Sequence, residues 1–350
     1  MNATMLAYGH ATGGNKGAIE LLRYFWERVS DMGKNYPFRP TPLDKYEQSR
    51  GLDHNPFFTA MGMLSSIMSP YQFNPTNINP LRDLVNELVD FEVLKKKPTI
   101  PLFLCATNCL TCKQKTFRGE NISLDAVMAS ACLPNLFQAV EIDGEFYWDG
   151  GYTANPPFLF FPYATGCGDV LFILVNPFIA HSVPIKPNEL IDRMNIVSFN
   201  ASLIKDLTFY RFLKEIGIIR GDADVPEALK PFTKLFIHAI NSQDKVHRYG
   251  FSSKYNTDMD FLEELYKLGY GKANQWMKLN YGKIGVGSTL DLDEVGVSAV
   301  SDWEEDLQEA GYTVYRRMGE GEWGVKPSNP ESGNKDAANK KRRKVNRDKK

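Results

Sequence analysis

The stretch from Ala129 to Pro157, ASACLPNLFQAVEIDGEFYWDGGYTANPP, constrains the fold of this chain more than any other. Its helical start is broken by a proline, and a hairpin-like pair of short strands follows. The second, Phe146-Tyr147-Trp148, is aromatic and suits a half-buried sheet surface. Asp149 ends this run, and Gly150-Gly151 then permits a tight turn or the close approach of another backbone. A carboxylate in this place is either a catalytic group held by its scaffold or a cap on its own turn, and the local sequence leaves both interpretations open.

Strand-like and helical segments alternate along the rest of the chain, which predicts an α/β layered fold. The run 169–175, DVLFILV, is almost continuously apolar and is typical of a strand buried on both faces of a parallel sheet. The apolar segment Met61–Met68 is either a core helix or a lid over a cleft. Further strands are expected at 100–106, 116–117 and 234–240, and helices at 15–30, 79–97, 123–131, 188–216, 258–268 and 301–310.

The first residues, MNATMLAYGHATGG, resemble the middle of a helix that ends at Gly9 or at Gly13-Gly14. They have no polar lead and no secretory signal, and no apolar run in the chain reaches the ~20 residues needed to span a bilayer. A chain that begins within a buried helix predicts that a segment is missing upstream. Residues 33–60 are rich in Pro, Gly and polar side chains, which predicts a long surface excursion.

The cysteines and histidines do not form a recognisable site. The five cysteines lack the density of a disulfide scaffold, which favours a reducing, cytoplasmic location. No Cys/His set has zinc-ligand spacing, and His238 within a strand is interpreted as a core residue. Neither a GxGxxG nor a Walker loop is present, so we expect no metal and no cofactor. No G-x-S-x-G elbow occurs, so this sequence offers no nucleophilic serine of that type.

The charge of the chain is distributed unevenly. Nine of the 41 Lys and Arg but only two of the 42 Asp and Glu lie in Lys335–Lys350, which leaves the body with an acidic excess of about eight. This basic tail has three interpretations: a solvated tail, a peripheral contact with anionic lipid at the inner face of a membrane, or a contact with nucleic acid. Neither interleaved aromatic residues nor an amphipathic helix supports the nucleic-acid interpretation.

Residues 129–157 resemble the second signature block of the patatin-like phospholipases, in which A-S-x-x-x-P, a short hairpin and D-G-G follow one another. Met1-Asn2-Ala3 resembles the start of the helix after the nucleophile elbow, where G-x-S-x-G-A runs into M-N-A. The stretch from Arg193 to Leu203 is similar to an extra C-terminal region of one bacterial subgroup. The resemblance covers about residues 1–280 and implies a three-layer αβα patatin-like core, of the FabD/lysophospholipase-like type, with a mostly helical C-terminal extension.

The resemblance also implies a lipid acyl hydrolase, a phospholipase or esterase of lipid degradation with a Ser–Asp dyad. Asp149 would be the general base, Gly150 and Gly151 would shape its turn, and a lipid or ester would be the substrate. The nucleophile would lie about four residues before Met1, with the oxyanion glycines further upstream. We therefore expect an N-terminally truncated core without esterase activity of its own, and the alternative is a non-catalytic remnant that binds lipid or a partner.

Three regions are predicted on this basis. Residues 1–180 form the patatin-like core, incomplete at its N-terminus, residues 181–324 form a helical or mixed extension, and residues 325–350 form a disordered basic tail. The sequence does not specify an oligomeric state.

Overall fold

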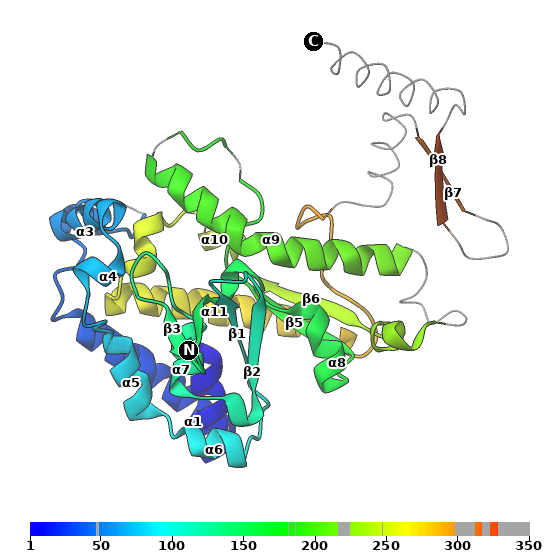
Figure 1. Cartoon of the computed structure of the whole chain (residues 1–350), viewed down its shortest axis with the longest axis horizontal. Coiled ribbons are helices and arrows are strands. Elements are labelled where there is room, and N and C mark those ends of the chain that lie inside the picture. Colours follow the sequence, from blue (N-terminus) through cyan, green and yellow to red (C-terminus); the bar gives the residue numbers. More distant parts are fainter. Residues whose placement is uncertain are drawn as a thin grey trace, which may run out of the picture. The chain divides into compact units, whose positions relative to one another are not determined.

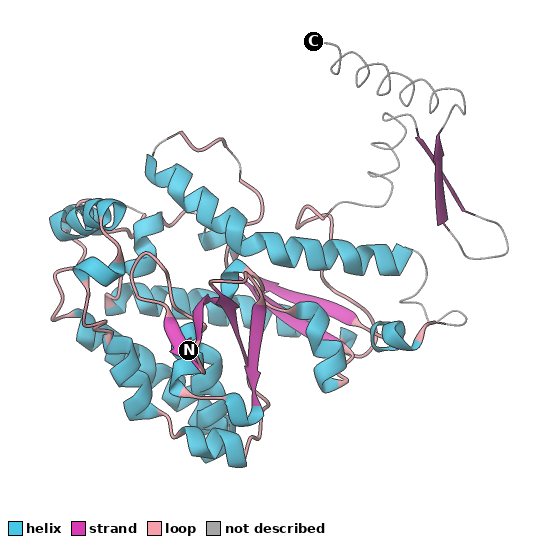
Figure 2. Cartoon of the chain, viewed as in Figure 1, coloured by secondary structure: helices cyan, strands magenta, loops and turns pink. Residues whose placement is uncertain are grey.

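The computed structural model describes residues 1–46, 49–180, 182–185, 187–215, 225–246, 248–297, 312–316 and 323–327. The chain divides into two compact units, one made of Met1–Asp206 with Lys230–Leu290 and the other of Leu207–Leu229 with Asp291–Lys350. The helix expected at 301–310 and the basic tail at 335–350 lie outside the described residues. The first unit carries the stretch from Ala129 to Pro157, and Figures 1 and 2 show the whole chain.

The first unit begins with helix α1 (Asn2–Gly33), which is kinked where Gly13 and Gly14 leave helical geometry. Both predictions for this region are confirmed, because the helix expected to end near Gly13-Gly14 and the amphipathic helix at 15–30 are the two arms of α1. Phe25 and Val29 on the second arm are buried, together with Met5 on the first. Both arms therefore contribute to the core, as expected of apolar residues at helical spacing.

Short helices follow α1: α2 (Pro42–Tyr46), α3 (Pro56–Ile67) and α4 (Pro70–Phe73). The excursion expected over 33–60 therefore contains α2 and the start of α3. Asn79 caps α5 (Pro80–Leu88) by accepting a hydrogen bond from the Leu81 N–H. The prediction of a single helix over 79–97 is wrong, because the helix is interrupted before Asp90. This carboxylate accepts from the Glu92 N–H and begins a new helix, α6 (Phe91–Lys96).

A four-stranded sheet in the order β2-β1-β4-β3 follows these helices in the sequence, and all its pairs are antiparallel. Its strands are β1 (Phe103–Asn108), β2 (Gln114–Arg118), β3 (Val140–Ile142) and β4 (Glu145–Asp149). Both expected strands and the expected hairpin are thus confirmed. Helix α7 (Leu124–Ala129), capped by Ser123, packs on this sheet and ends earlier than the predicted Ala131. The core between the sheet and the helices includes Met5, Phe25, Leu84, Val85, Ala106, Phe117, Ala126 and Tyr147.

A second sheet pairs β5 (Asp169–Leu174) with β6 (Phe236–Asn241) in parallel, as the apolar runs predicted. The expected burial of β5 on both faces is wrong. Phe172 and Leu174 are buried, whereas Leu171 is exposed and Ile173 is 73% exposed. Because side chains alternate across a strand, only one side of β5 packs on described elements, and its other side faces solvent. The sheet joins residues on both sides of the boundary expected at 180, and the three-region division stays a prediction.

Helices complete the two units. They are α8 (Phe161–Thr165), α9 (Pro187–Glu215), α10 (Gln243–Val246) and α11 (Met259–Asn280), with 3-10 turns at Gly119–Asn121, Gly150–Tyr152, Phe158–Phe160, Glu227–Phe232, Phe251–Tyr255 and Tyr281–Lys283. The long helices expected near 188–216 and 258–268 are α9 and α11. Among the described residues, no helix combines the length and the apolar character that crossing a membrane requires.

The second unit contains the antiparallel pair β7 (Tyr312–Arg316) and β8 (Trp323–Pro327). Residues 325–327 pair with β7, so a strand stands where disorder was expected from residue 325. Elsewhere in this unit the Arg211 guanidinium contacts Asp293 Oδ1 at 2.5 Å and donates to the Val297 carbonyl oxygen at 2.8 Å.

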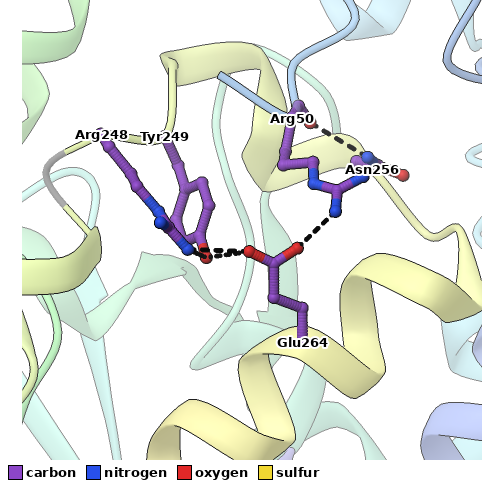
Figure 3. A network of polar contacts seen from close by, with 5 residues as sticks. All are labelled: Arg50, Arg248, Tyr249, Asn256 and Glu264. Atoms are coloured by element: carbon purple, nitrogen blue, oxygen red, sulfur yellow. Dashed lines mark hydrogen bonds and ion pairs between the residues drawn. The ribbon is translucent and has the colours of Figure 1, made fainter. Parts of the chain in front are cut away.

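A polar network around Glu264 fixes one wall of the first unit (Figure 3). The Glu264 carboxylate on α11 accepts from the Tyr249 hydroxyl at 2.9 Å and lies between the guanidinium groups of Arg50 and Arg248, at 2.7 and 2.8 Å. Asn256 donates to the Arg50 carbonyl oxygen at 3.0 Å. The network thereby holds the residue-50 loop, the 248–256 segment and α11 in one arrangement.

Candidate functional site

The Asp149 turn lies at the end of β4, where the strand leaves the four-stranded sheet. The backbone of Asp149 pairs with Ala106 of β1, and its N–H donates to the Cys132 carbonyl oxygen at 2.9 Å. The Thr107 hydroxyl donates to the Asp149 carbonyl oxygen at 2.8 Å. Because the main chain is held from both sides, the direction of the Asp149 side chain is set by the scaffold.

The two glycines after Asp149 are required by close packing. A Cβ at Gly150 would overlap the carbonyl oxygen of Cys105, and a Cβ at Gly151 would overlap the ring of Phe199. Both glycines are buried within the 3-10 turn Gly150–Tyr152. The prediction that these residues allow the close approach of another group is therefore confirmed.

The Asp149 side chain has one hydrogen bond from the described residues, in which Oδ1 accepts from the Gly151 N–H at 2.8 Å. Burial raises the pKa of this carboxyl above its ordinary value, although the Gly151 hydrogen bond and the positive charge of the Met1 amino group oppose that rise in part. This hydrogen bond confirms that Asp149 caps its own turn. The cap leaves the second oxygen, Oδ2, available for other chemistry.

The groups around Asp149 respond to its charge. Burial, followed by the negative charge of Asp149, raises the pKa of the Cys132 thiol to about 11. The same two causes, in the same order, raise the pKa of Tyr152. Burial and the charge of Asp149 therefore both favour the neutral forms of Cys132 and Tyr152.

Two threonines that carry no motif in the sequence lie beside Asp149 in the structure. Besides its bond to Asp149, Thr107 lies 2.9 Å from the Thr153 hydroxyl, with Oγ1 facing Oγ1. Thr107 is buried at the end of β1, and Thr153 follows the 3-10 turn. The pairing of β1 with β4 brings them together. Thr107 could therefore be selected from the sequence only if the register of these two strands were known.

A large cavity of about 1200 Å³ lies next to the turn. Tyr152 and Phe199 line it and contact each other, with ring centroids 5.1 Å apart. Gly151 packs against the same Phe199 ring, and Leu133, one residue after the Cys132 that holds Asp149, also lines the cavity. The Asp149 turn therefore forms part of the support directly behind the cavity wall.

The cavity lining is mainly apolar and comes from distant parts of the sequence. It includes Phe38, Phe58, Met61, Met63, Phe73, Ile78, Leu133, Leu136, Phe137, Ile191, Ile196, Phe199, Phe251 and Tyr255. Helices α3 and α9 contribute to it, as does the 248–256 segment held by the Glu264 network. A cavity of this size and polarity is of the kind that binds apolar ligands.

No metal centre is present among the described residues, where no group of three or more His, Cys, Asp and Glu is arranged to hold an ion. The cysteines are all free. His10 lies 2.7 Å from the Thr99 hydroxyl, while His181 and His247 fall outside the described residues.

His238 is a buried core residue, as predicted. Its Nε2 lies 3.0 Å from Asp169 Oδ1, and its Nδ1 lies 2.9 Å from Thr289 Oγ1. Asp169 Oδ1 also accepts from the Gly285 N–H at 2.8 Å, and the Trp276 ring packs edge-on against the imidazole. The order hydroxyl, imidazole, carboxylate is that of a catalytic triad, but none of these residues lines the cavity.

No curated protein matches the chain. Residues 1–161 match the family model described as patatin-like phospholipase, and the match includes α1, the four-stranded sheet and the Asp149 turn. The structure around this match has the α/β core and the largely helical extension that the resemblance implied. Residues 1–161 of this chain are a patatin-like phospholipase domain.

Proposed function

We propose that this chain supplies the lipid-binding cavity and the general base, Asp149, of a lipid acyl hydrolase that works with a Ser–Asp dyad. The family acts on lipid esters, and the observation that supports a lipid substrate here is the large apolar cavity beside the Asp149 turn. A long acyl chain in such a cavity is removed from water, which is the main favourable term in binding it.

Three features of Asp149 suit it to act as a base. Its backbone is fixed by Cys132 and Thr107, its Oδ2 is available, and burial raises its pKa toward neutrality. A base with a pKa closer to the working pH removes a proton more effectively while it remains largely ionised. In the proposed reaction the carboxylate accepts the proton of the attacking serine hydroxyl and an acyl-enzyme forms. The carboxylate then removes a proton from the water that releases the acid.

We further propose that the nucleophile precedes α1, in a segment outside the sequence given. The start of α1 lies near the base, since the charge of the Met1 amino group acts on the Asp149 carboxyl. The solvent-facing side of β5, where Leu171 and Ile173 are exposed, supports a further element of the fold that packs on this face. An apolar strand face normally packs against another element of its fold.

The test uses two forms of the protein. The 350-residue chain is expected to show no turnover of a p-nitrophenyl ester. The same chain extended by the reading frame upstream of Met1 is expected to hydrolyse the ester and to carry G-x-S-x-G. Hydrolysis by the 350-residue chain that Asp149→Asn abolished would overturn the proposed position of the nucleophile. An extended chain whose rate did not change on Asp149→Asn would overturn the role of Asp149.

A non-catalytic lipid-binding function is the alternative, and one observation favours it. The cavity is formed entirely by residues of this chain, so it needs no additional segment to take up an apolar ligand. An upstream reading frame that contains a stop codon or a frameshift, together with binding of a fluorescent fatty acid by the 350-residue chain, would support this function over hydrolysis.

A further inference from the structure

The segment from Asn55 to Leu81 contains no Asp, Glu, Lys or Arg, although 24% of the residues in the chain are charged. It carries α3, α4 and the loop that leads to α5. Charged side chains oppose the transfer of a protein surface into an apolar medium, because ions are costly to remove from water. This segment has no charged side chain that would have to be removed from water.

Apolar side chains of this segment are exposed to solvent. On α3, Phe57 is 59% exposed, Met63 67% and Ile67 80%, and no residue of that helix is buried. Tyr71 of α4 and Ile78 continue the exposure beyond α3. We refer to Phe57, Met63, Ile67, Tyr71 and Ile78 as the α3–α4 surface. An apolar surface concentrated in one segment is typical of an interaction site.

Helix α3 is attached mainly through its first turn. The buried Asn55 accepts from the Phe58 N–H and donates to the carbonyl oxygens of Pro37 and Arg39, at 2.8 and 2.7 Å. Phe58 then packs on the Tyr255 ring, with centroids 5.4 Å apart. In Figure 1, α3 lies at the edge of the unit, away from the sheets. The first turn of α3 is therefore anchored, while none of its residues is buried.

The same helix lines the cavity. Phe58, Met61 and Ser65 contribute to the lining, and Met63 belongs both to the lining and to the exposed surface. Helix α3 thus separates the cavity from solvent, with apolar side chains directed to both sides. An apolar ligand that reached α3 from outside would find apolar contacts as far as the cavity.

We propose that the α3–α4 surface docks this protein on the surface of a lipid assembly. There it exchanges water for hydrocarbon contacts and gives acyl chains direct access to the cavity. We choose a lipid surface as the partner because Met63 connects the α3–α4 surface to the cavity. This choice also rests on the proposed function, in which the cavity binds an acyl chain. Because the segment is uncharged, docking is independent of headgroup charge and insensitive to salt. This separates it from any electrostatic contact made by the basic tail.

The experiment measures co-sedimentation of the 350-residue protein with neutral phosphatidylcholine vesicles. The wild-type chain is expected to bind equally at low and high salt. Phe57→Glu combined with Ile67→Glu should lower the fraction bound at least about tenfold, since neither residue lines the cavity and each would place a charge in hydrocarbon. The matched control is Ile19→Glu on α1, a residue 64% exposed, which should bind as the wild type does. Circular dichroism and thermal melting verify that each variant folds.

Two results would overturn the proposal. One is vesicle binding that disappears in high salt or on deletion of residues 335–350, because the basic tail would then be the contact. The other is concentration-dependent dimerisation that the Phe57/Ile67 double variant removes while its vesicle binding is unchanged, because the surface would then bind a second copy. Asp149→Asn should bind vesicles as the wild type does, so a failure of hydrolysis and a failure of docking give different results.

Discussion

Asp149 and Asp169 each end or begin a strand of the first unit, yet their surroundings differ. Asp169, at the start of β5, contacts His238 and the Gly285 N–H through Oδ1, and the imidazole contacts Thr289 in turn. Asp149 has a single hydrogen bond, no histidine within the contacts described, and a large apolar cavity nearby. The first group resembles a catalytic triad in its connectivity, whereas the second has the few partners and the neighbouring cavity on which the proposed role of Asp149 as a base rests.

The difference shows that connectivity alone does not identify a catalytic group. His238 is 1% exposed and covered by Trp276, so no substrate reaches the imidazole, and its hydrogen bonds stabilise the junction between β5, β6 and the 285–289 loop. We expect Asp149 to contribute less to stability, because its carboxylate is buried and accepts a single hydrogen bond. A partly satisfied buried charge beside a cavity is a better indication of function than a fully satisfied one.

The largest expected effect separates the two carboxylates by activity. In the extended chain that hydrolyses esters, Asp149→Asn should lower kcat by about 10²–10⁴-fold, the usual contribution of a general base. Asp169→Asn should leave kcat within about threefold of wild type if the variant is folded, because Asp169 does not act as a base in the proposed reaction. Steady-state hydrolysis of one ester by both variants makes the measurement. A loss in the Asp169 variant as large as in the Asp149 variant would mean that the His238 group takes part in the reaction.

A change in the His238 group should affect stability more than a change at Asp149. His238→Ala leaves a cavity against Trp276 and removes a partner from both Asp169 and Thr289, so the free energy of unfolding should fall by roughly 2–4 kcal/mol. Asp149→Asn keeps an acceptor for the Gly151 N–H and removes a buried charge, so it should not destabilise the chain at pH 7. Urea denaturation of the two variants provides the measurement. Equal losses would show that the two groups are structurally equivalent.

The packing of the Asp149 turn predicts a smaller but site-specific effect. Gly150→Ala places a methyl group against the Cys105 carbonyl oxygen and should cost about 1–3 kcal/mol of unfolding free energy, as overpacking does. The matched control is Gly271→Ala on α11, where a Cβ meets nothing within 4 Å. It should stabilise the helix by roughly 0.5–1 kcal/mol. If both variants behaved alike, the close approach at Gly150 would not be a constraint on the turn.

The smallest expected effect is on the pH dependence of stability. The pKa of Asp149 is raised in the folded chain, so the folded state keeps a proton that the unfolded state releases. This contribution is complete below the ordinary aspartate pKa and is lost as the pH rises through the raised value. The melting temperature of Asp149→Asn should therefore match wild type at low pH and exceed it at neutral pH. A gain that was largest in acid would contradict the direction of the shift.

The sequence predicted much of the local structure because its signals were local. Asn79 and Ser123 cap helices where capping residues are expected, and the hairpin before Asp149 follows its aromatic run. The break at Asp90 was missed because the apolar spacing of α5 continues across it into α6, and only the cap contact with Glu92 reveals a new helix.

The candidate site was harder to predict because it is assembled from distant residues. Asp149 was selected from its motif, but Thr107 and Phe199 reach it through sheet pairing and through the packing of α9. The exposed side of β5 was missed for the opposite reason. A continuous apolar run indicates that both faces can be buried, but it does not specify which element covers them.

The long-range contacts of the Asp149 turn also bear on the order in which the chain folds. The turn is completed only when Thr107, 42 residues earlier, has paired and when Phe199 from α9 has packed on Gly151. Contacts across such separations require loop closure before they contribute any stability, whereas α1 and α11 form from neighbours in sequence. We therefore expect the helical scaffold to assemble before the carboxylate acquires its fixed position.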